Sequence, residues 1–424
     1  MFRPGRQGRQ PDQVFAAPSG VAAFDMSANH GREASVSTRP GPWLAPVTRA
    51  TFAVRLPSLT FLRFGADNRP MITQSLFAYV GCYTAPERNG RGNGINVYRV
   101  DPRNGALRHV QHLGGLENPS FLALNVAGDR LYSVHGDRSE ATSYTVDRET
   151  GRLAVLNRQS TGGYNPIHLA FDAGQRFLVV SNYGSDSLVA LPISKDGSLG
   201  PYSTLTAVAA PLGPHRTEQK NVRPHHNPLD RTGRTFYLPC KGSDCVIGYR
   251  LDPRRGVLVE TSRVTSRPGA GPRHIDFHPR KPFAYVINEL DSTITAYRQD
   301  TASGGLTPLQ TVPSTPSDFT GYSTGAEIWV DGGGRNVYVS NRGHDSIGVF
   351  GIDAAKGTLT PRQWVPTKGG VPRFFAFDPA ERFLYVANQG SDSIVAYKIG
   401  RNGLLAPTRL RTEVGSPACI VFSR

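Results

Sequence analysis

Charged and imidazole side chains recur at two matching positions of seven short segments, most of which begin with proline. Counted from that proline or its equivalent, the first position holds Ser120, Ile167, His225, Arg273, Ala326, Arg373 and Ala418. The second position holds Phe121, His168, His226, His274, Glu327, Phe374 and Cys419. Strands that only packed a core would carry small apolar residues at both positions. Because imidazoles transfer protons near neutral pH and guanidinium groups bind anions, the set predicts acid–base chemistry on an anionic ligand.

A second group of polar side chains lies where another repeated strand should end. The residues there are Asn182, Lys241, Asn288, Glu289, Asn341, Arg342, Asn388 and Gln389. Asn suits such a position because it can cap a turn. Glu289 and Arg342 depart from this pattern because they carry charge. They could pair for structural reasons alone, or they could join His225 and Arg273 as an acid–base group in an anion-binding pocket.

The elements that would hold these residues come from a sevenfold repeat. Strand-like segments separated by 47 to 58 residues align on Tyr79, Tyr132, Val179, Tyr237, Tyr285, Tyr338 and Tyr385. That period suits four short strands and their turns, which make one propeller blade. Turn residues at fixed offsets separate the period-2 runs, as in hairpins, and no helical period of useful length appears. We therefore predict an all-β, seven-bladed β-propeller whose innermost strands, led by proline or its equivalent, face the axial channel.

The two ends of the repeat predict how the ring closes. No proline-led strand precedes Phe77, whereas a spare one, Pro417–Phe422, follows the last unit. Pairing this strand with the one at Phe77 completes a blade from both ends of the chain and leaves no open edge in the ring. The predicted propeller domain spans residues 71–424.

The first 70 residues do not share the repeat. They contain nine Arg against four Asp or Glu and show no sustained strand or helix period. They also lack the continuous apolar stretch of a signal peptide. We expect residues 1–70 to be a disordered leader, a targeting tail, or translated upstream sequence before a true start at Met71.

Composition limits the class of protein further. No apolar run reaches the 18 or so residues that a membrane helix needs. The four Cys form no CxxC pair and no zinc-type spacing, so a reducing cytoplasm is the simplest location. The formal charge of +15, about +10 without the leader, favours anionic small molecules. Nucleic acid is not an expected partner, because no basic run is interleaved with aromatic residues.

The repeat region resembles the propeller lactonase family, which includes cycloisomerase-type 6-phosphogluconolactonases and fungal carboxy-muconate cyclases. The selective motifs are Pro224-His225-His226-Asn227-Pro228, Gly271-Pro272-Arg273-His274, Ile287-Asn288-Glu289-Leu290, Gly325-Ala326-Glu327-Ile328 and Ser340-Asn341-Arg342-Gly343. The resemblance implies that the catalytic residues are His225, Arg273, Glu289 and Arg342. The residues expected to bind substrate are His226, His274, Glu327 and Arg373. Two departures from the family's usual text, Pro-His-His-Asn at 224–227 and the charged strand end at 134–138, leave the substrate's identity open.

The activity that the resemblance implies is hydrolysis of an anionic sugar lactone, with 6-phosphogluconolactone as the favoured substrate. Glu289 or His225 would activate water, and His225 would protonate the leaving alkoxide. Arg273 and Arg342 would hold the anionic group and stabilise the oxyanion. The sequence has no Gly-x-Ser-x-Gly, EF-hand or HExxH motif, so we expect neither a serine nucleophile nor a metal, and no cofactor. Two alternatives stay open, a muconate-type lactone cycloisomerase and a non-catalytic binding scaffold, and the oligomeric state is not predicted.

Overall fold

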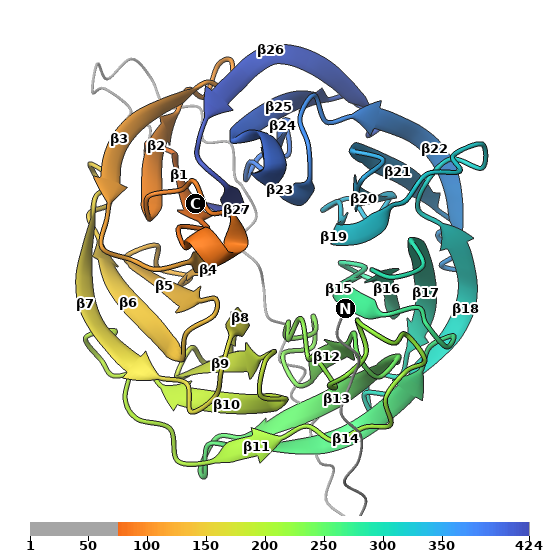
Figure 1. Ribbon diagram of the computed structural model, residues 1–424, viewed down its shortest axis with the longest axis horizontal. Coiled ribbons are helices and arrows are strands. Elements are labelled where there is room, and N and C mark those ends of the chain that lie inside the picture. The colour runs from red at the N-terminus through yellow and green to blue at the C-terminus, as the bar shows by residue number, and fades with distance from the viewer. Residues whose placement is uncertain (1–74, 424) are drawn as a thin grey trace, which may run out of the picture. The chain divides into compact units, whose positions relative to one another are not determined.

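The computed structural model describes residues 75–423, which form a ring of seven β-sheets around a central axis (Figure 1). Six sheets have four strands and one has three, and neighbouring strands within each sheet are antiparallel. The seven-bladed propeller predicted from the repeat is confirmed. Residues 1–70, for which a leader or an upstream start is predicted, lie outside the described residues.

The strands follow one another outward from the axis in each blade. Blade one consists of β27 (Pro417–Phe422), β1 (Phe77–Cys82), β2 (Ile95–Val100) and β3 (Leu107–Leu113). Blades two and three consist of β4 (Pro119–Leu124), β5 (Arg130–His135), β6 (Glu140–Val146) and β7 (Leu153–Ser160), and of β8 (Pro166–Phe171), β9 (Phe177–Asn182), β10 (Ser187–Pro192) and β11 (Leu205–Ala207). Blade four consists of β12 (Phe236–Cys240), β13 (Cys245–Asp252) and β14 (Val257–Thr265).

The remaining blades repeat the four-strand order. Blade five consists of β15 (Pro272–Phe277), β16 (Phe283–Asn288), β17 (Thr293–Gln299) and β18 (Leu306–Pro313). Blades six and seven consist of β19 (Thr324–Val330), β20 (Asn336–Arg342), β21 (Ser346–Ile352) and β22 (Leu359–Pro366), and of β23 (Pro372–Phe377), β24 (Phe383–Asn388), β25 (Ser393–Ile399) and β26 (Leu405–Glu413). The helices of the described chain are two 3₁₀ turns, η1 (Pro86–Arg88) and η2 (Gln389–Ser391). Neither has the length or the apolar character to cross a membrane.

The second strand of each blade carries the aromatic anchor of the repeat. These strands are mainly apolar because neighbouring blades cover both of their faces, and every residue of β1, β16 and β24 is buried, including Asn288 and Asn388 at the ends of the last two. The hydroxyl of Tyr385 in blade seven donates to the carbonyl oxygen of Gly105 in blade one at 2.7 Å. Gly105 has a φ of 79°, and a Cβ there would lie 2.9 Å from that hydroxyl, so the turn requires glycine. Similar tyrosine-to-glycine hydrogen bonds link blades two to three, four to five and six to seven.

The ring closes as the sequence predicts. The C-terminal strand β27 pairs antiparallel with β1, with Val421 opposite Tyr79 and Ile420 opposite Val80. Blade one therefore contains strands from both ends of the described chain. The Tyr385–Gly105 hydrogen bond joins the last blade to the first across the same junction.

The innermost segment of blade four departs from the repeat. Residues 224–229 contact β12 only through isolated bridges, and not as a regular strand. The Asn227 side chain turns to blade three instead, where it donates to the Val179 carbonyl at 2.8 Å and accepts from the Ser181 hydroxyl at 3.0 Å. Pro228 has no N–H for a strand ladder. The prediction of a regular inner strand in every unit is therefore wrong for blade four, which carries two of the candidate histidines.

Candidate active site

A bulge in the inner strands explains why chemistry can occupy two consecutive positions. In β15, Pro272 pairs with Asn288 and His274 pairs with the adjacent Ile287, so Arg273 is an extra residue without its own partner. The same register shift occurs in β4, β8 and β23. Consecutive side chains of a regular strand point to opposite faces, whereas a bulge re-aims one of them. Side chains at the first and the second position can therefore both face the channel.

Residues at the two positions line two cavities at opposite ends of the channel. The first-position residues Ile167, His225 and Arg373 line a cavity where the inner strands begin, together with residues from the ends of the second strands. Most second-position residues line a cavity where the inner strands end. The two cavities share no lining residue. We name them the Glu289 cavity and the Glu327 cavity.

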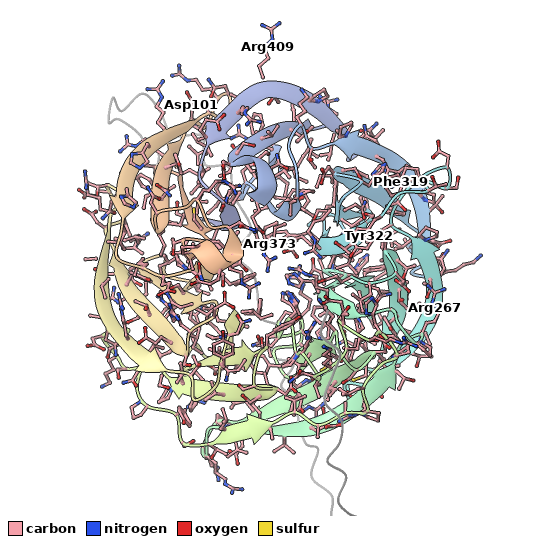
Figure 2. The ribbon with its side chains drawn as sticks, in the orientation of Figure 1. Asp101, Arg267, Phe319, Tyr322, Arg373 and Arg409 are labelled. Carbon is pink, nitrogen blue, oxygen red and sulfur yellow. The ribbon has the colours of Figure 1, made fainter. Side chains whose placement is uncertain are left out.

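The Glu289 cavity has a volume of about 210 Å³. Its lining residues are Tyr83, Arg88, Asn165, Ile167, Tyr183, Glu218, His225, Lys241, Glu289, Arg342 and Arg373. Four of the sequence-predicted site residues therefore meet here, namely His225, Glu289, Arg342 and Arg373. Figure 2 shows Arg373 projecting into the central opening of the ring.

Glu289 is the centre of the charge network in this cavity. One carboxylate oxygen accepts a hydrogen bond from Nζ of Lys241 at 2.7 Å. The other lies 3.0 Å from Nε of Arg273 and 3.2 Å from Nη2 of Arg342. Burial alone would raise the pKa of Glu289, but attraction to Arg342, Lys241 and Arg273 outweighs it and holds that pKa well below its usual range. Glu289 is therefore a fixed negative charge that holds three cations in place, and a weak base.

His225 contributes an imidazole to the lining of the same cavity. Burial, reinforced by the charge of Arg273, lowers the pKa of its imidazole well below the ordinary value. Its Nδ1 atom is buried and has no hydrogen-bond partner in residues 75–423. The ring lies 5.5 Å from the Tyr183 ring and 5.1 Å from the His274 ring, measured between centroids. A neutral imidazole of this kind can accept a proton from water.

Arg273 supports the cavity from behind and does not line it. Its guanidinium donates to the carbonyl oxygen of Ala326 at 2.5 Å and faces Glu289, while only 2 % of the residue is exposed. Burial, together with the nearby Arg342 charge, lowers its pKa. The contacts suit a positioning role for Arg273 through Glu289, in place of direct contact with a substrate.

Arg373 is the lining cation without a carboxylate partner. Its guanidinium carbon lies 5.0 Å from the centre of the Tyr83 ring, which is a cation–π contact. No Asp or Glu of the described chain lies within ion-pair distance of it. By contrast, Arg88 is held bidentately by Asp137 at 2.6 and 2.5 Å. Arg373 is therefore available to an anionic ligand.

Three charged lining residues, Arg88, Lys241 and Glu218, were not among the predicted site residues, and Arg88 lies in the turn η1. Lys241 occupies the strand-end position that also carries Glu289 and Arg342, so the repeat alignment contained the signal for it. Glu218 lies in the connection between β11 and β12, which has no counterpart in the repeat, so no alignment of blades could indicate it. The Glu218 carboxylate lies 2.9 Å from Nζ of Lys241.

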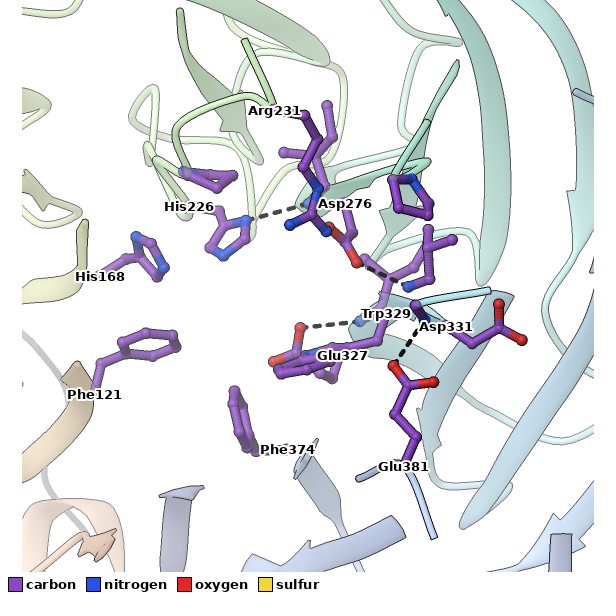
Figure 3. A pocket seen from close by; sticks show the side chains of 16 residues that line it. Phe121, His168, His226, Arg231, Asp276, Glu327, Trp329, Asp331, Phe374 and Glu381 are labelled. Carbon is purple, nitrogen blue, oxygen red and sulfur yellow. Dashed lines mark hydrogen bonds and ion pairs between the residues drawn. The ribbon is translucent and has the colours of Figure 1, made fainter. Parts of the chain in front are cut away.

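The Glu327 cavity lies at the other end of the channel and has a volume of about 460 Å³. Figure 3 shows the Glu327 carboxyl group directed inward among Phe121, Phe374 and His226. His274, which lines neither cavity, stacks on His226 with 4.1 Å between ring centroids and shares a 2.9 Å hydrogen bond with Oε1 of Glu327. His226, His274 and Glu327, which were expected to bind substrate with Arg373, are thus not brought to the Glu289 cavity.

Glu327 and His274 are both uncharged near neutral pH. Burial raises the pKa of Glu327 to about 8 and lowers the pKa of His274 well below its ordinary value. Oε1 of Glu327 accepts the backbone N–H of Ile328 at 3.0 Å, and Oε2 is buried without a partner among the described residues. The two ends of the channel therefore hold buried carboxyl groups in opposite charge states.

Imidazole and carboxyl groups are common metal ligands. Within residues 75–423, no group of three or more His, Cys, Asp or Glu side chains is arranged to hold a metal ion.

Comparison with known proteins places the chain in a family. Residues 77–422 match the model of the family described as "Lactonase, 7-bladed beta-propeller". The 6-phosphogluconolactonase of Bacillus subtilis strain 168 is 35% identical over 353 residues, covering 81% of this chain and 97% of the relative. The 6-phosphogluconolactonase of Pectobacterium carotovorum is 32% identical over 322 residues, covering 72% of this chain and 91% of the relative.

A solved structure agrees with these matches. The structure of the periplasmic gluconolactonase of Pseudomonas aeruginosa superposes with a TM-score of 0.76 at 30% identity, covering 82% of this chain and 99% of that one. The family match spans nearly all of the described residues, and its seven blades are those of Figure 1. The chain therefore belongs to the seven-bladed β-propeller lactonase family.

Proposed function

We propose that this protein hydrolyses 6-phosphogluconolactone to 6-phosphogluconate in the Glu289 cavity. The observation that carries the proposal is the charge of the lining. Arg88 is already paired with Asp137, so three cations, Lys241, Arg342 and Arg373, stand against two carboxylates, Glu218 and Glu289. The surplus of positive charge suits a phosphate group, and relatives named 6-phosphogluconolactonase support this substrate over the unphosphorylated lactone.

In the proposed reaction, His225 takes a proton from water as the water oxygen attacks the lactone carbonyl carbon. The ring C–O bond of the tetrahedral intermediate then breaks, and the leaving oxygen takes the proton back from His225. The net change adds one water molecule, and the new carboxylic acid loses its proton to solvent.

The cations of the cavity would act on the charge that develops at the carbonyl oxygen. Arg342 and Arg373 are the guanidinium groups proposed to donate to the oxyanion, since both line the cavity. Glu289 is proposed as the residue that fixes the cations, because its three cationic neighbours occupy both of its carboxylate oxygens. Arg273 would act through Glu289 as a positioning residue.

The cytoplasm is the compartment we propose for this reaction. Cys82, Cys240, Cys245 and Cys419 are all buried and free. Cys240 and Cys245 lie opposite each other in the β12–β13 ladder and remain thiols, which fits a reducing environment. Fractionation of cells that produce the full chain tests this point, and recovery in an oxidising compartment would contradict it.

The test of the function compares two substrates on the full chain. The rate of ring opening of 6-phosphoglucono-δ-lactone is measured by proton release at mildly acidic pH, and the spontaneous rate is subtracted. Glucono-δ-lactone is measured in parallel. We expect turnover of the phosphorylated lactone with the higher kcat/KM. Turnover of neither lactone would favour a binding scaffold. Equal kcat/KM values for the two lactones would show that the protein does not recognise the phosphate group.

A further inference from the structure

The connection between blades three and four brings an acidic side chain to the Glu289 cavity. Residues 208–223 separate β11 from the inner segment of blade four, and they form the longest inter-blade connection in the described chain. The segment is anchored beside the end of β12, where the Gln219 amide donates to the Lys241 carbonyl at 3.0 Å. The backbone N–H of Gly242 donates to the Val222 carbonyl at 2.8 Å. This anchoring places Glu218 at the rim of the cavity.

Glu218 binds two cations through one carboxylate oxygen. Its Oε2 atom lies 2.9 Å from Nζ of Lys241 and accepts a hydrogen bond from Nη1 of Arg223 at 2.8 Å. The hydrogen bond from Lys241, which is the largest effect, keeps the pKa of Glu218 below its ordinary value despite the opposing effect of burial. The carboxylate is therefore charged, and it lies between the ammonium group of Lys241 and the guanidinium group of Arg223.

The two partners of Glu218 differ in how much they depend on it. Lys241 has a second carboxylate, Glu289, at 2.7 Å on its buried side. Its side chain is 6 % exposed, whereas that of Glu218 is 40 % exposed, so Lys241 is fixed and Glu218 lies at the solvent side of the pair. An incoming anion can thus replace Glu218 while Lys241 stays in place.

We propose that Glu218 occupies the subsite for the substrate's phosphate, so that the phosphate must displace the Glu218 carboxylate from Lys241 and Arg223. This inference rests on the proposed function. It adds where the substrate's phosphate binds and which side chain must move before it can bind. Lys241 and Arg223 form the phosphate subsite, while Arg342 and Arg373 remain for the lactone carbonyl. Glu218 lowers affinity for any anion at the subsite, because a like charge must move away before the anion binds.

The test uses inorganic phosphate as the probe, so that it does not depend on turnover. Isothermal titration calorimetry measures the Kd of phosphate for the full chain, for Glu218→Gln and for Glu260→Gln. Glu260 is a matched control, since its side chain is also 40 % exposed and pairs with an arginine, Arg263, at 2.8 Å. We expect Glu218→Gln to bind phosphate roughly tenfold tighter than the unmodified chain, the order expected from removing one like charge at a partly exposed site. Glu260→Gln should change the Kd less than twofold.

A second variant tests the location. Adding Lys241→Met to Glu218→Gln should abolish the gain in phosphate affinity, with circular dichroism confirming the fold. Phosphate binding that is unchanged or weakened by Glu218→Gln, undetectable in both proteins, or insensitive to Lys241→Met would overturn the inference.

The kinetic form of the test uses substrate selectivity. The ratio of kcat/KM for 6-phosphoglucono-δ-lactone over glucono-δ-lactone should rise roughly tenfold in Glu218→Gln, again from loss of one like charge. A ratio that stays constant while phosphate binds tighter would overturn the assignment of the substrate's phosphate to this subsite. If the unmodified chain hydrolyses neither lactone, the proposed function fails, while the phosphate titration still decides whether Glu218 guards an anion subsite.

Discussion

Replacing Glu289 by Gln should destabilise the propeller strongly, whereas Glu327→Gln should not. Both residues are buried, with exposed fractions of 8 % and 2 %. Glu289 is ionised and lies 2.7 Å from Lys241, 3.0 Å from Arg273 and 3.2 Å from Arg342. A neutral amide would leave the Arg273 guanidinium buried without its counter-charge. Removing one partner of such a buried ion pair costs about 3–5 kcal/mol of unfolding free energy.

Glu327 provides the contrast because its carboxyl group is protonated at neutral pH, with a pKa of about 8. A glutamine amide has nearly the same shape and charge, and it keeps an oxygen to accept from the Ile328 N–H and from His274. We therefore expect no loss of stability at pH 7 and a gain instead, because the amide is neutral without taking up the proton that the raised pKa requires of Glu327. Urea unfolding of the full chain at pH 7 measures both variants. Similar losses in the two variants, or a loss below about 1 kcal/mol for Glu289→Gln, would refute the assignment of opposite charge states.

Three other predictions concern the pH dependence of stability, the turnover of Arg373→Met and the closure of the ring. Because the folded-state pKa of Glu327 is raised from 4.5 to about 8, its stabilising contribution is complete below about pH 4.5 and is lost as pH rises toward 8. The unfolding free energy of the unmodified protein should therefore fall relative to Glu327→Gln by about 1.4 kcal/mol per pH unit in that window, and a flat difference would be inconsistent with a protonated Glu327. Arg373→Met should lower kcat for the phosphorylated lactone by about 10²-fold in initial-rate assays, since it removes a proposed donor to the oxyanion; an unchanged kcat argues against contact with the reacting carbonyl. Ending the chain at Gly415 removes β27 and exposes the edge of β1, so cooperative thermal unfolding followed by circular dichroism should be lost, and a sharp transition would show that closure by β27 is dispensable.

The sequence was sufficient to predict the ring and its closure because both depend on local, repeated signals. The anchor tyrosines recur since each must fill the space between two blades, and Tyr385 additionally bonds to Gly105 of the first blade. The spare strand Pro417–Phe422 could pair only with the blade that lacked an inner strand. Blade four was the exception, because the contacts of Asn227 with blade three are specific to that position.

The candidate site was predictable only in part. His225, Glu289 and Arg342 meet in one cavity because strand ends from neighbouring blades converge there. His226 and Glu327 follow the first-position residues directly in sequence, yet their side chains line the opposite cavity.

Burial and the non-repeating connection account for the other differences. Arg273 is covered by Glu289 and Ala326, a degree of burial that residue type does not reveal. Glu218 lies outside the repeat, so its approach to Lys241 depends on how residues 208–223 fold back onto β12.

The central claim is that the Glu289 cavity is the catalytic site and that His225 is its base. The most direct measurement is kcat for 6-phosphoglucono-δ-lactone in His225→Asn, with His112→Asn as the control, because His112 is exposed on the outer strand β3. We expect kcat to fall by about 10²–10⁴-fold in His225→Asn, as for loss of a general base, and to stay unchanged in His112→Asn. A folded His225→Asn protein with the kcat of the unmodified chain would contradict the account.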